Sequence, residues 1–175
     1  MSVFTFKNAV FTGSTKVLDI FDNKQEKVGS IQRIFRNKFQ KISDVIFGND
    51  FIINVHAYDV DNDLVCEINE VLGMKTLVKS KWEGKSNNIG DFTLYDKTKI
   101  KTNPRWEVQT SGRTYKIKKN LGNKKVIIND DDKNIAEISY DNLFQPLNIT
   151  IQSYSEQLTY LEIAALYLLV TIRYK

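Results

Sequence analysis

The stretch that decides the fold is Leu158-Thr-Tyr-Leu-Glu-Ile-Ala-Ala-Leu-Tyr-Leu-Leu-Val-Thr-Ile172, close to the end of the sequence. From Leu161 to Ile172 it is apolar on every side of a helical wheel, except at Glu162 and Thr171. A helix on a protein surface carries an apolar stripe and a polar back. This segment has no polar back, so either lipid or the interior of a protein must surround it.

The length of the segment favours the protein interior. The apolar run has 12 residues, or 15 when it is counted from Leu158, whereas a helix needs about 20 to span a bilayer. A helix of 15 residues is roughly 22 Å long, which is about the depth of a β-barrel. We therefore expect a helix threaded through a barrel, and we prefer it to a membrane tail anchor.

The flanking residues suit the ends of such a helix. Ser155 is a suitable N-cap, and Glu156 places a negative charge in the first turn. Arg173 and Lys175 suit the C-terminal end. The sequence thus predicts a central helix over residues 155–174.

Short runs of β-branched and aromatic residues precede this helix, separated by turns rich in Asp, Asn, Gly and Lys. Such runs are typical of strands. The predicted strands are Val3–Thr12, Lys16–Asp22, Val28–Arg36, Lys41–Phe47, Phe51–Asp59, Leu64–Glu70, Lys75–Trp82, Gly90–Asp96, Trp106–Thr110, Thr114–Lys119, Lys125–Asp130, Ile135–Tyr140 and Leu147–Ser153. About a dozen strands and one helix predict a mainly β fold, a closed barrel of antiparallel hairpins around the hydrophobic C-terminal helix.

Three of the hairpins repeat a pattern. An Asp/Asn-rich turn precedes each of Val28-Gly-Ser-Ile31, Val65-Cys-Glu-Ile68 and Ile135-Ala-Glu-Ile138. Asp and Asn suit such turns because their side chains bond the nearby backbone. The small second residue of each run is expected to lie against something bulky.

The order of elements resembles the superfamily of tubby C-terminal domains, plant LURP-one-related proteins and phospholipid scramblases, and most of all its small bacterial members. Lys16–Asp22 before Val28–Ile31 resembles the opening hairpin, and Ile135–Asp141 with Leu147–Ile151 before the helix resembles the closing segment. The resemblance covers residues 3–174. It implies a barrel around a C-terminal helix and no classical enzymatic activity. Eukaryotic tubby domains bind phosphoinositide head groups through surface Lys and Arg and scramblases act on phospholipids, whereas many small members have no assigned role. We expect no cofactor. The phosphoinositide-contacting motif of tubby domains is not recognisable, so none of its residues is transferred.

The length and composition of the chain indicate its domain number and its compartment. The 175 residues suit one domain over 1–175. The single cysteine, Cys66, excludes an intrachain disulfide and fits a reducing compartment. The N-terminal residues lack the pattern of a signal peptide. We expect a monomer in the cytoplasm, either free or at the periphery of a membrane.

Catalysis is not predicted. His56 is the only histidine, and Cys66 lies in the next predicted strand, with Asp59 close by. A Cys–His mechanism requires the two side chains to meet beside an orienting carboxylate. Neighbouring strands of one hairpin bring such residues near each other in any case, so the pair has no catalytic meaning by itself. The sequence also contains no Gly-rich phosphate loop and no Cys-x-x-Cys pair.

A calcium loop is suggested by one spacing and opposed by two features. Asp59, Asp61 and Asp63, with Glu70 in the twelfth position, have the carboxylate spacing of such a loop. The sixth position, however, holds Leu64 instead of glycine, and strands flank the segment. A hairpin turn explains the same residues, so no metal site is predicted and calcium dependence stays open.

Positive charge gathers in the middle of the chain. Residues 75–125 contain 14 Lys and Arg against 4 Asp and Glu, while the rest contains 11 against 17. Such a region can attract phosphates or anionic lipid. Because strand side chains alternate, the cations can share faces. The candidate binding residues are Lys79, Lys81, Lys97, Lys99, Lys101, Arg105, Arg113, Lys116 and Lys118.

These observations predict a non-enzymatic module that binds anionic phospholipid head groups or a membrane surface. The first alternative is a protein-interaction or structural module with no lipid affinity, whose lysines only form a solvated face. Nucleic-acid binding ranks lower because Tyr115 and Ile117 alternate away from Lys116 and Lys118, and no RNA-binding aromatic signature is present.

Overall fold

The computed structural model describes residues 1–8, 14–47, 51–73, 80–120, 122–141 and 147–174. These residues form twelve strands and two helices. The strands are β1 (Ser2–Asn8), β2 (Leu18–Phe21), β3 (Lys27–Ile34), β4 (Asn54–Asp59), β5 (Leu64–Glu70), β6 (Lys81–Ser86), β7 (Gly90–Asp96), β8 (Arg105–Gln109), β9 (Thr114–Lys119), β10 (Lys125–Asp130), β11 (Lys133–Tyr140) and β12 (Leu147–Ser153). The helices are α1 (Lys38–Phe47) and α2 (Tyr160–Arg173).

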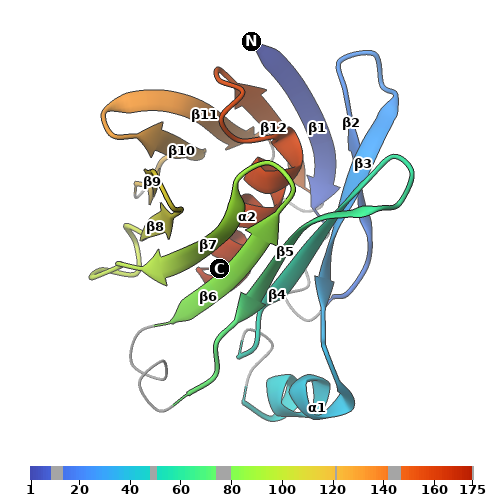
Figure 1. Cartoon of the computed structure of the whole chain (residues 1–175), viewed down its shortest axis with the longest axis vertical. Helices are drawn as coiled ribbons and strands as arrows, with labels where there is room; N and C mark the ends of the chain where they lie inside the picture. The colour runs from blue at the N-terminus through green and yellow to red at the C-terminus, as the bar shows by residue number, and fades with distance from the viewer. Residues whose placement is uncertain (9–13, 48–50, 74–79, 121, 142–146, 175) are drawn as a thin grey trace.

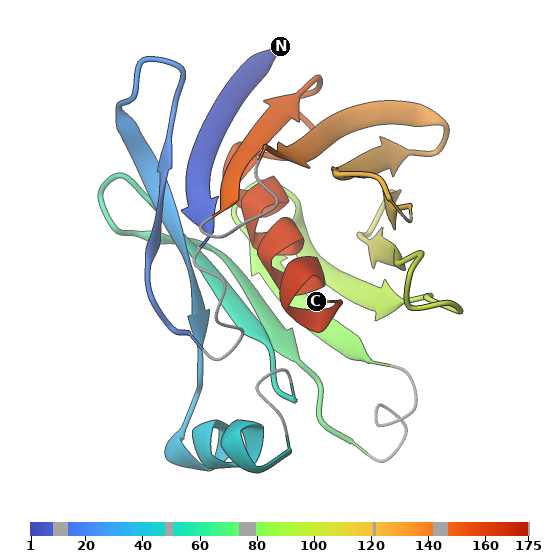
Figure 2. The same cartoon turned by 180° about the vertical axis from the view of Figure 1, so that it is seen from behind.

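The strands form a closed barrel in which each strand pairs with its neighbours in the sequence. The first strand, β1, closes the barrel by pairing antiparallel with both β12 and β2. Helix α2 runs through the interior, while α1 lies outside, beyond the ends of β3 and β4 (Figures 1 and 2). The predicted mainly β barrel with a C-terminal helix is thus confirmed.

Most of the predicted strands exist, and one prediction is wrong. The strands β5, β7, β9, β10 and β12 have the predicted bounds. The run Lys41–Phe47, however, is part of helix α1. The Asn37 side chain accepts a hydrogen bond from the backbone N–H of Gln40 at 2.9 Å, which caps the helix. The predicted strand Lys75–Trp82 lies mostly outside the described residues, and β6 continues beyond it to Ser86.

Helix α2 forms the centre of the core. Every residue from Leu161 to Val170 is buried, as an all-round apolar helix inside a barrel requires. The helix contacts β3, β4, β5 and β12. Its aromatic residues also pack on β1, where Tyr160 stacks on Phe4 and Tyr167 meets Phe6 edge to face. Among the described residues, no helix has the length and apolar content needed to cross a bilayer.

The start of α2 differs from the prediction. The N-cap is Thr159 instead of Ser155. The Thr159 hydroxyl accepts a hydrogen bond from the Glu162 N–H at 3.2 Å, and the Glu162 carboxylate accepts one from the Thr159 N–H at 2.6 Å. This capping box satisfies two backbone donors at once, which explains why the helix begins there. The side chains of Ser86 and Asn88 also donate hydrogen bonds to Glu162, so hydrogen bonds from the protein replace water around its buried carboxylate.

The small residue expected opposite a bulky element is found at Gly29 in β3. A Cβ atom at this position would lie 2.6 Å from the carbonyl oxygen of Tyr58 and 2.9 Å from Cδ2 of Leu161. Glycine therefore lets β3 approach both β4 and the central helix.

We expect Gly29→Ala to lower the free energy of unfolding by about 2 kcal/mol, because overpacking of this kind typically costs about 1–3 kcal/mol. The matched control is Gly112→Ala, where a Cβ would meet no atom within 4 Å. Chemical denaturation of both variants measures the difference. Equal stability of the two would show that α2 does not limit the approach of β3.

Candidate functional site

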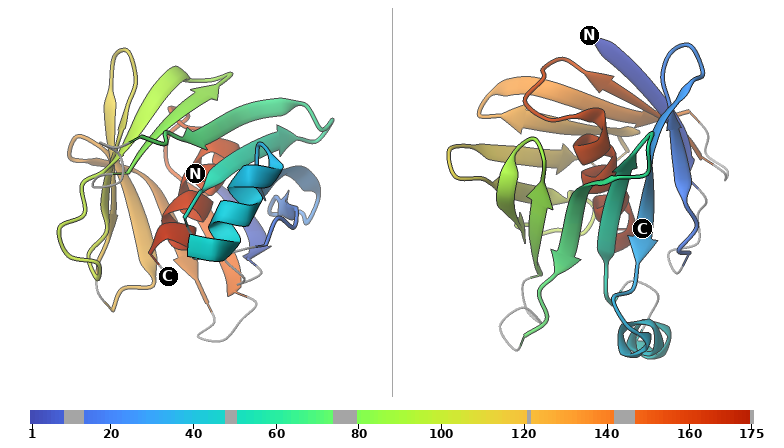
Figure 3. Two further views of the ribbon diagram at one scale, coloured as in Figure 1. Left: turned by 90° about the horizontal axis from the view of Figure 1, so that it is seen from below. Right: turned by 45° about the vertical axis from the view of Figure 1, so that its right-hand side comes forward.

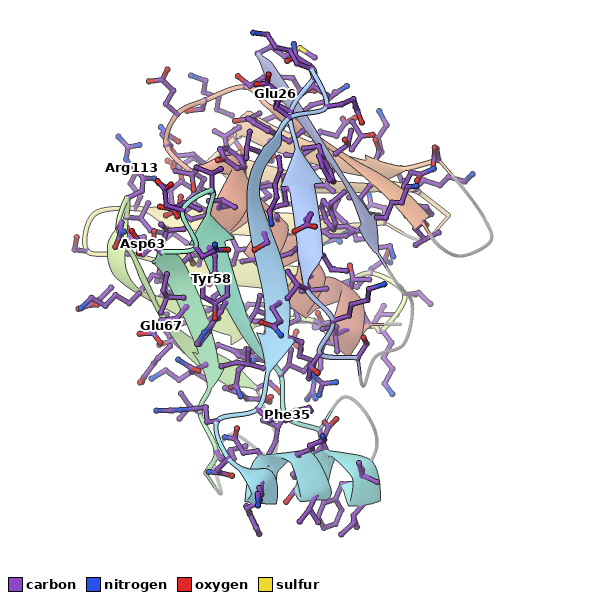
Figure 4. The ribbon with its side chains drawn as sticks, turned by 90° about the vertical axis from the view of Figure 1, so that its right-hand side faces the viewer. Glu26, Phe35, Tyr58, Asp63, Glu67 and Arg113 are labelled. Atoms are coloured by element: carbon purple, nitrogen blue, oxygen red, sulfur yellow. The ribbon has the colours of Figure 1, made fainter. Side chains whose placement is uncertain are left out.

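The meander places alternate connections at opposite ends of the barrel. The connections after odd-numbered strands, together with α1 and the C-terminus of α2, lie at one end, which we call the α1 end. The connections after even-numbered strands, together with the N-terminus of α2, lie at the other, the far end. Figure 3 shows α1 lying across its end of the molecule. In Figure 4, Phe35 lies beside α1, while Glu26 and Asp63 lie toward the far end.

The two ends carry opposite charge. In α1 and the connections after odd-numbered strands, the described residues include eight basic side chains against two acidic ones, Asp44 and Asp141. The basic residues are Lys16, Arg36, Lys38, Lys41, Lys97, Lys99, Lys101 and Lys124. The connections of the far end hold seven acidic side chains against Lys24 and Arg113. The acidic residues are Asp22, Glu26, Asp61, Asp63, Asp131, Asp132 and Glu156.

Six of the nine basic residues predicted from the sequence lie at or near the α1 end. Lys97, Lys99 and Lys101 belong to the connection between β7 and β8. Lys81 and Arg105 begin their strands at this end, and Lys118, beside Arg105 in the register, lies near the end of β9. The remaining three do not join them: Lys116 lies in the middle of β9, Arg113 is at the far end, and Lys79 lies outside the described residues.

Several of these cations have partners within the protein. The Lys81 ammonium lies 2.9 Å from the Glu83 carboxylate, and that of Lys97 lies 3.5 Å from Glu107. At the far end, Arg113 and Asp130 lie 4.0 Å apart. Lys99 and Lys101 are exposed and form no ion pair with a described residue.

Arg105 has a structural role. Its guanidinium donates to the carbonyl oxygens of Pro104 at 2.8 Å and Lys119 at 2.7 Å, and to the Asn120 side chain at 2.6 Å. These bonds tie the start of β8 to the end of β9. Arg105 therefore holds the rim of the barrel and is poorly placed to bind a ligand with the same donors.

Helix α1 turns its apolar residues outward. Its buried residues are the polar ones, Gln40, Ser43 and Asp44. Five large apolar side chains are 57–73% exposed: Phe39, Ile42, Val45, Ile46 and Phe47. The sequence prediction missed this surface because it assigned Lys41–Phe47 to a strand. The signal was the helical spacing of residues 39, 42 and 46 after the Asn37 cap.

Polar contacts fasten α1 to the barrel. The Arg33 guanidinium of β3 lies 2.7 Å from the Asp44 carboxylate, and both side chains are only 1% exposed. The same carboxylate accepts a hydrogen bond from the Ile52 N–H at 3.1 Å. The Gln40 side chain accepts one from the Asn54 amide at 3.1 Å. The orientation of α1 is therefore fixed by buried, directional bonds.

Glu70, at the end of β5, belongs to the same polar network. Its carboxylate accepts a hydrogen bond from the Ile53 N–H at 2.7 Å, and its own N–H donates to the Asn54 side chain at 2.9 Å. Burial raises the pKa of Glu70 to about 7, although the Ile53 bond and the charges of Arg173 and Arg33 oppose this. The neutral carboxyl is thus the form that the folded protein prefers at mildly acid pH.

His56 and Cys66 face opposite sides of the sheet. In the register, His56 lies opposite Glu67, while Cys66 lies opposite Ala57. The His56 ring contacts the Tyr58 hydroxyl at 3.2 Å and lies 3.8 Å from Glu67 on the outer face. Cys66 is 1% exposed on the inner face, and burial raises the pKa of its thiol to about 12. The two side chains do not form a nucleophile–base pair.

The Asp59–Asp63 segment forms a hairpin turn between β4 and β5. The Asp59 carboxylate accepts hydrogen bonds from the N–H groups of Asp61 at 3.0 Å and Asp63 at 2.9 Å. Glu70 lies at the opposite end of β5, so it cannot complete a calcium loop with these residues. Within the described ranges, no three His, Cys, Asp or Glu side chains are grouped to hold a metal ion.

A pocket of about 330 Å³ opens at the far end, between β1, β12 and the start of α2. Its lining includes Phe4, Tyr154, Glu156 and Tyr160, but no lysine or arginine. Glu156 is the one charged side chain of this lining, so the pocket offers no cluster of cationic side chains to an anionic ligand.

We expect Glu70→Gln to remove a pH dependence of stability. Because the folded-state pKa of about 7 exceeds the ordinary value of 4.5, the contribution of Glu70 is complete below pH 4.5 and is lost as the pH rises through 7. The free energy of unfolding of the wild type should therefore fall by up to about 3 kcal/mol between pH 5 and pH 8 because Glu70 ionises, and the variant should lack this decrease. Denaturation at both pH values tests this, with the exposed Glu156→Gln as control. A variant that keeps the wild-type pH dependence would contradict it.

Comparison with known proteins agrees with this architecture. The family model of the Tubby C-terminal like domain matches residues 4–174. Searches of curated proteins and of solved structures found no significant match. The family match covers nearly the whole barrel and its central helix, as the resemblance in the sequence predicted. The chain therefore belongs to the family of Tubby C-terminal like domains.

Proposed function

We propose that the protein is a monomeric, non-enzymatic binding module that attaches peripherally to anionic phospholipid surfaces through its α1 end. Membership of the family supports a binding module without enzymatic activity. The separation of His56 from Cys66 agrees with that class. The observation that carries the proposal is the opposite charge of the two barrel ends.

The size of the charge effect is sufficient for reversible binding. Each Lys or Arg close to an anionic leaflet contributes about 1 kcal/mol. Eight basic side chains at the α1 end, with Asp44 already paired to Arg33, leave a clear positive excess there. The acidic far end is repelled by the same surface, so the charges also orient the barrel.

The proposal refines the one made from the sequence. The barrel wall is a weaker candidate because Lys81 is paired with Glu83 and Arg105 ties the start of β8 to the end of β9. The connections of the α1 end add Lys16, Arg36, Lys38, Lys41 and Lys124, which the sequence hypothesis did not include. Binding by an end also suits a barrel whose interior is filled by α2.

We expect the variant Lys97→Glu/Lys99→Glu/Lys101→Glu to bind anionic vesicles at least about a hundredfold more weakly than the wild type, since three attractive charges become repulsive. Arg105 is left unchanged because it ties β8 to β9. Flotation with phosphatidylcholine vesicles, with and without 30% phosphatidylserine as a chosen composition, measures binding at low and at physiological salt.

The control is Lys24→Glu/Arg113→Glu/Lys133→Glu, which makes the same change in net charge away from the α1 end. It should bind like the wild type. Equal weakening of both variants would mean that only net charge matters. If the wild-type protein remains in the unbound fraction at low salt with both neutral and anionic vesicles, lipid binding is refuted and a protein-interaction module is favoured.

A further inference from the structure

Resting on the proposed function, we propose that α1 is a membrane-inserting helix. Its outward face, formed by Phe39, Ile42, Val45 and Ile46, enters the boundary between head groups and acyl chains of an anionic bilayer. Insertion adds to electrostatic attraction, because it gives the exposed apolar face of α1 its own contact with the bilayer.

Helix α1 has an inverted orientation, with polar residues buried and apolar residues exposed. A helix docked on a globular protein normally buries its apolar stripe and exposes its polar residues. In α1 the buried residues are Gln40, Ser43 and Asp44, while Phe39 and Ile42 are 73% and 57% exposed. A contiguous apolar face of this kind marks a surface that another apolar phase covers.

The positive charge around this apolar face selects an anionic bilayer as the partner. Lys38 precedes Ile42 by four residues, and Lys41 precedes Val45 by four, so each lysine borders an apolar side chain on the exposed surface. Lysine stems can lie along the apolar boundary while the ammonium groups reach anionic head groups. A second copy of the same face would carry the same positive charge, and like charges repel, which disfavours a dimer through α1.

Helix α1 is also held firmly in position on the barrel. The Arg33–Asp44 pair and the Gln40–Asn54 hydrogen bond join it to β3 and β4. The helix lies across the α1 end (Figures 3 and 4), and its buried residues are the polar ones that bond to the barrel. A barrel resting on a membrane with this end would therefore lay α1 along the membrane surface.

A fluorescent probe at position 42 tests the insertion directly. Ile42→Cys can be labelled with an environment-sensitive dye, because the native Cys66 is buried and its thiol pKa is raised to about 12. Ser111→Cys, in the exposed turn at the far end, is the control position. With anionic vesicles, we expect a blue shift at position 42 and quenching by bromine-labelled acyl chains, and neither effect at position 111.

A pair of variants tests the contribution to affinity. Phe39→Ser/Ile42→Ser should weaken binding to anionic vesicles by about tenfold or more, and the remaining binding should be more sensitive to salt. Val60→Ser/Leu64→Ser, which removes two exposed apolar side chains away from α1, should leave binding unchanged.

The outcomes separate this inference from the proposed function. A wild-type protein that binds anionic vesicles while the probe at position 42 stays in water, and whose Phe39/Ile42 variant binds equally well, overturns insertion and leaves charge-driven binding intact. Failure of the wild type to bind any vesicle overturns both. A dimer that dissociates in the Phe39→Ser/Ile42→Ser variant would assign the face to a second copy and also overturn insertion.

Discussion

The whole structure depends on a central helix that has no polar face. Because every residue of α2 from Leu161 to Val170 is buried, a continuous apolar wall has to surround it, and the twelve strands provide this by closing into a barrel. The inward side chains are fitted to the helix: Gly29 leaves room for Leu161, and Trp82 packs on Trp106, which Tyr174 meets edge to face. The filled interior directs binding chemistry to the outer wall and the two ends.

The repeat noticed in the sequence explains why the ends differ in charge. The three Asp/Asn-rich turns follow β2, β4 and β10, which are all even-numbered strands. In a meander, such turns come together at one end, so a repeated local turn preference creates an acidic far end. The connections after odd-numbered strands are not bound by that pattern, and they carry the lysines. The preference for Asp and Asn in these turns thus produces a charge difference between the two ends of the barrel. Such a difference can orient the protein on a charged surface.

The sequence predicted what depends on local patterns and missed what depends on tertiary context. The length and all-round apolarity of Leu158–Ile172 were enough to predict a helix inside a barrel, and alternation placed β5 and β7 with their bounds. The N-cap is a different case, because Thr159-Tyr-Leu-Glu162 has the capping-box spacing in the sequence itself and the choice of Ser155 overlooked it. Across the barrel, Ser86 and Asn88 add hydrogen bonds to Glu162 that no local pattern shows. The run Lys41–Phe47 looked like a strand because its apolar residues are adjacent as well as helically spaced. Only the buried partner Arg33 shows that Asp44 faces inward.

The orientation of α1, with polar residues buried and apolar residues exposed, affects both the stability of the fold and the position of the apolar face. A buried ion pair such as Arg33–Asp44 contributes little net stability compared with apolar residues of similar size, since desolvation offsets the attraction. An ordinary amphipathic helix in the other orientation would bury Phe39 and Ile42 and remove that cost. The observed orientation therefore gives up stability on both faces, as sites of function commonly do. In return, the orientation of α1 on the barrel is fixed, because hydrogen bonds of charged and amide groups require one geometry, whereas apolar packing would let the helix rotate about its axis. Fixing the helix with Arg33, Gln40 and Asp44 holds its apolar residues outward at the positively charged end, where an anionic, partly apolar surface can meet both.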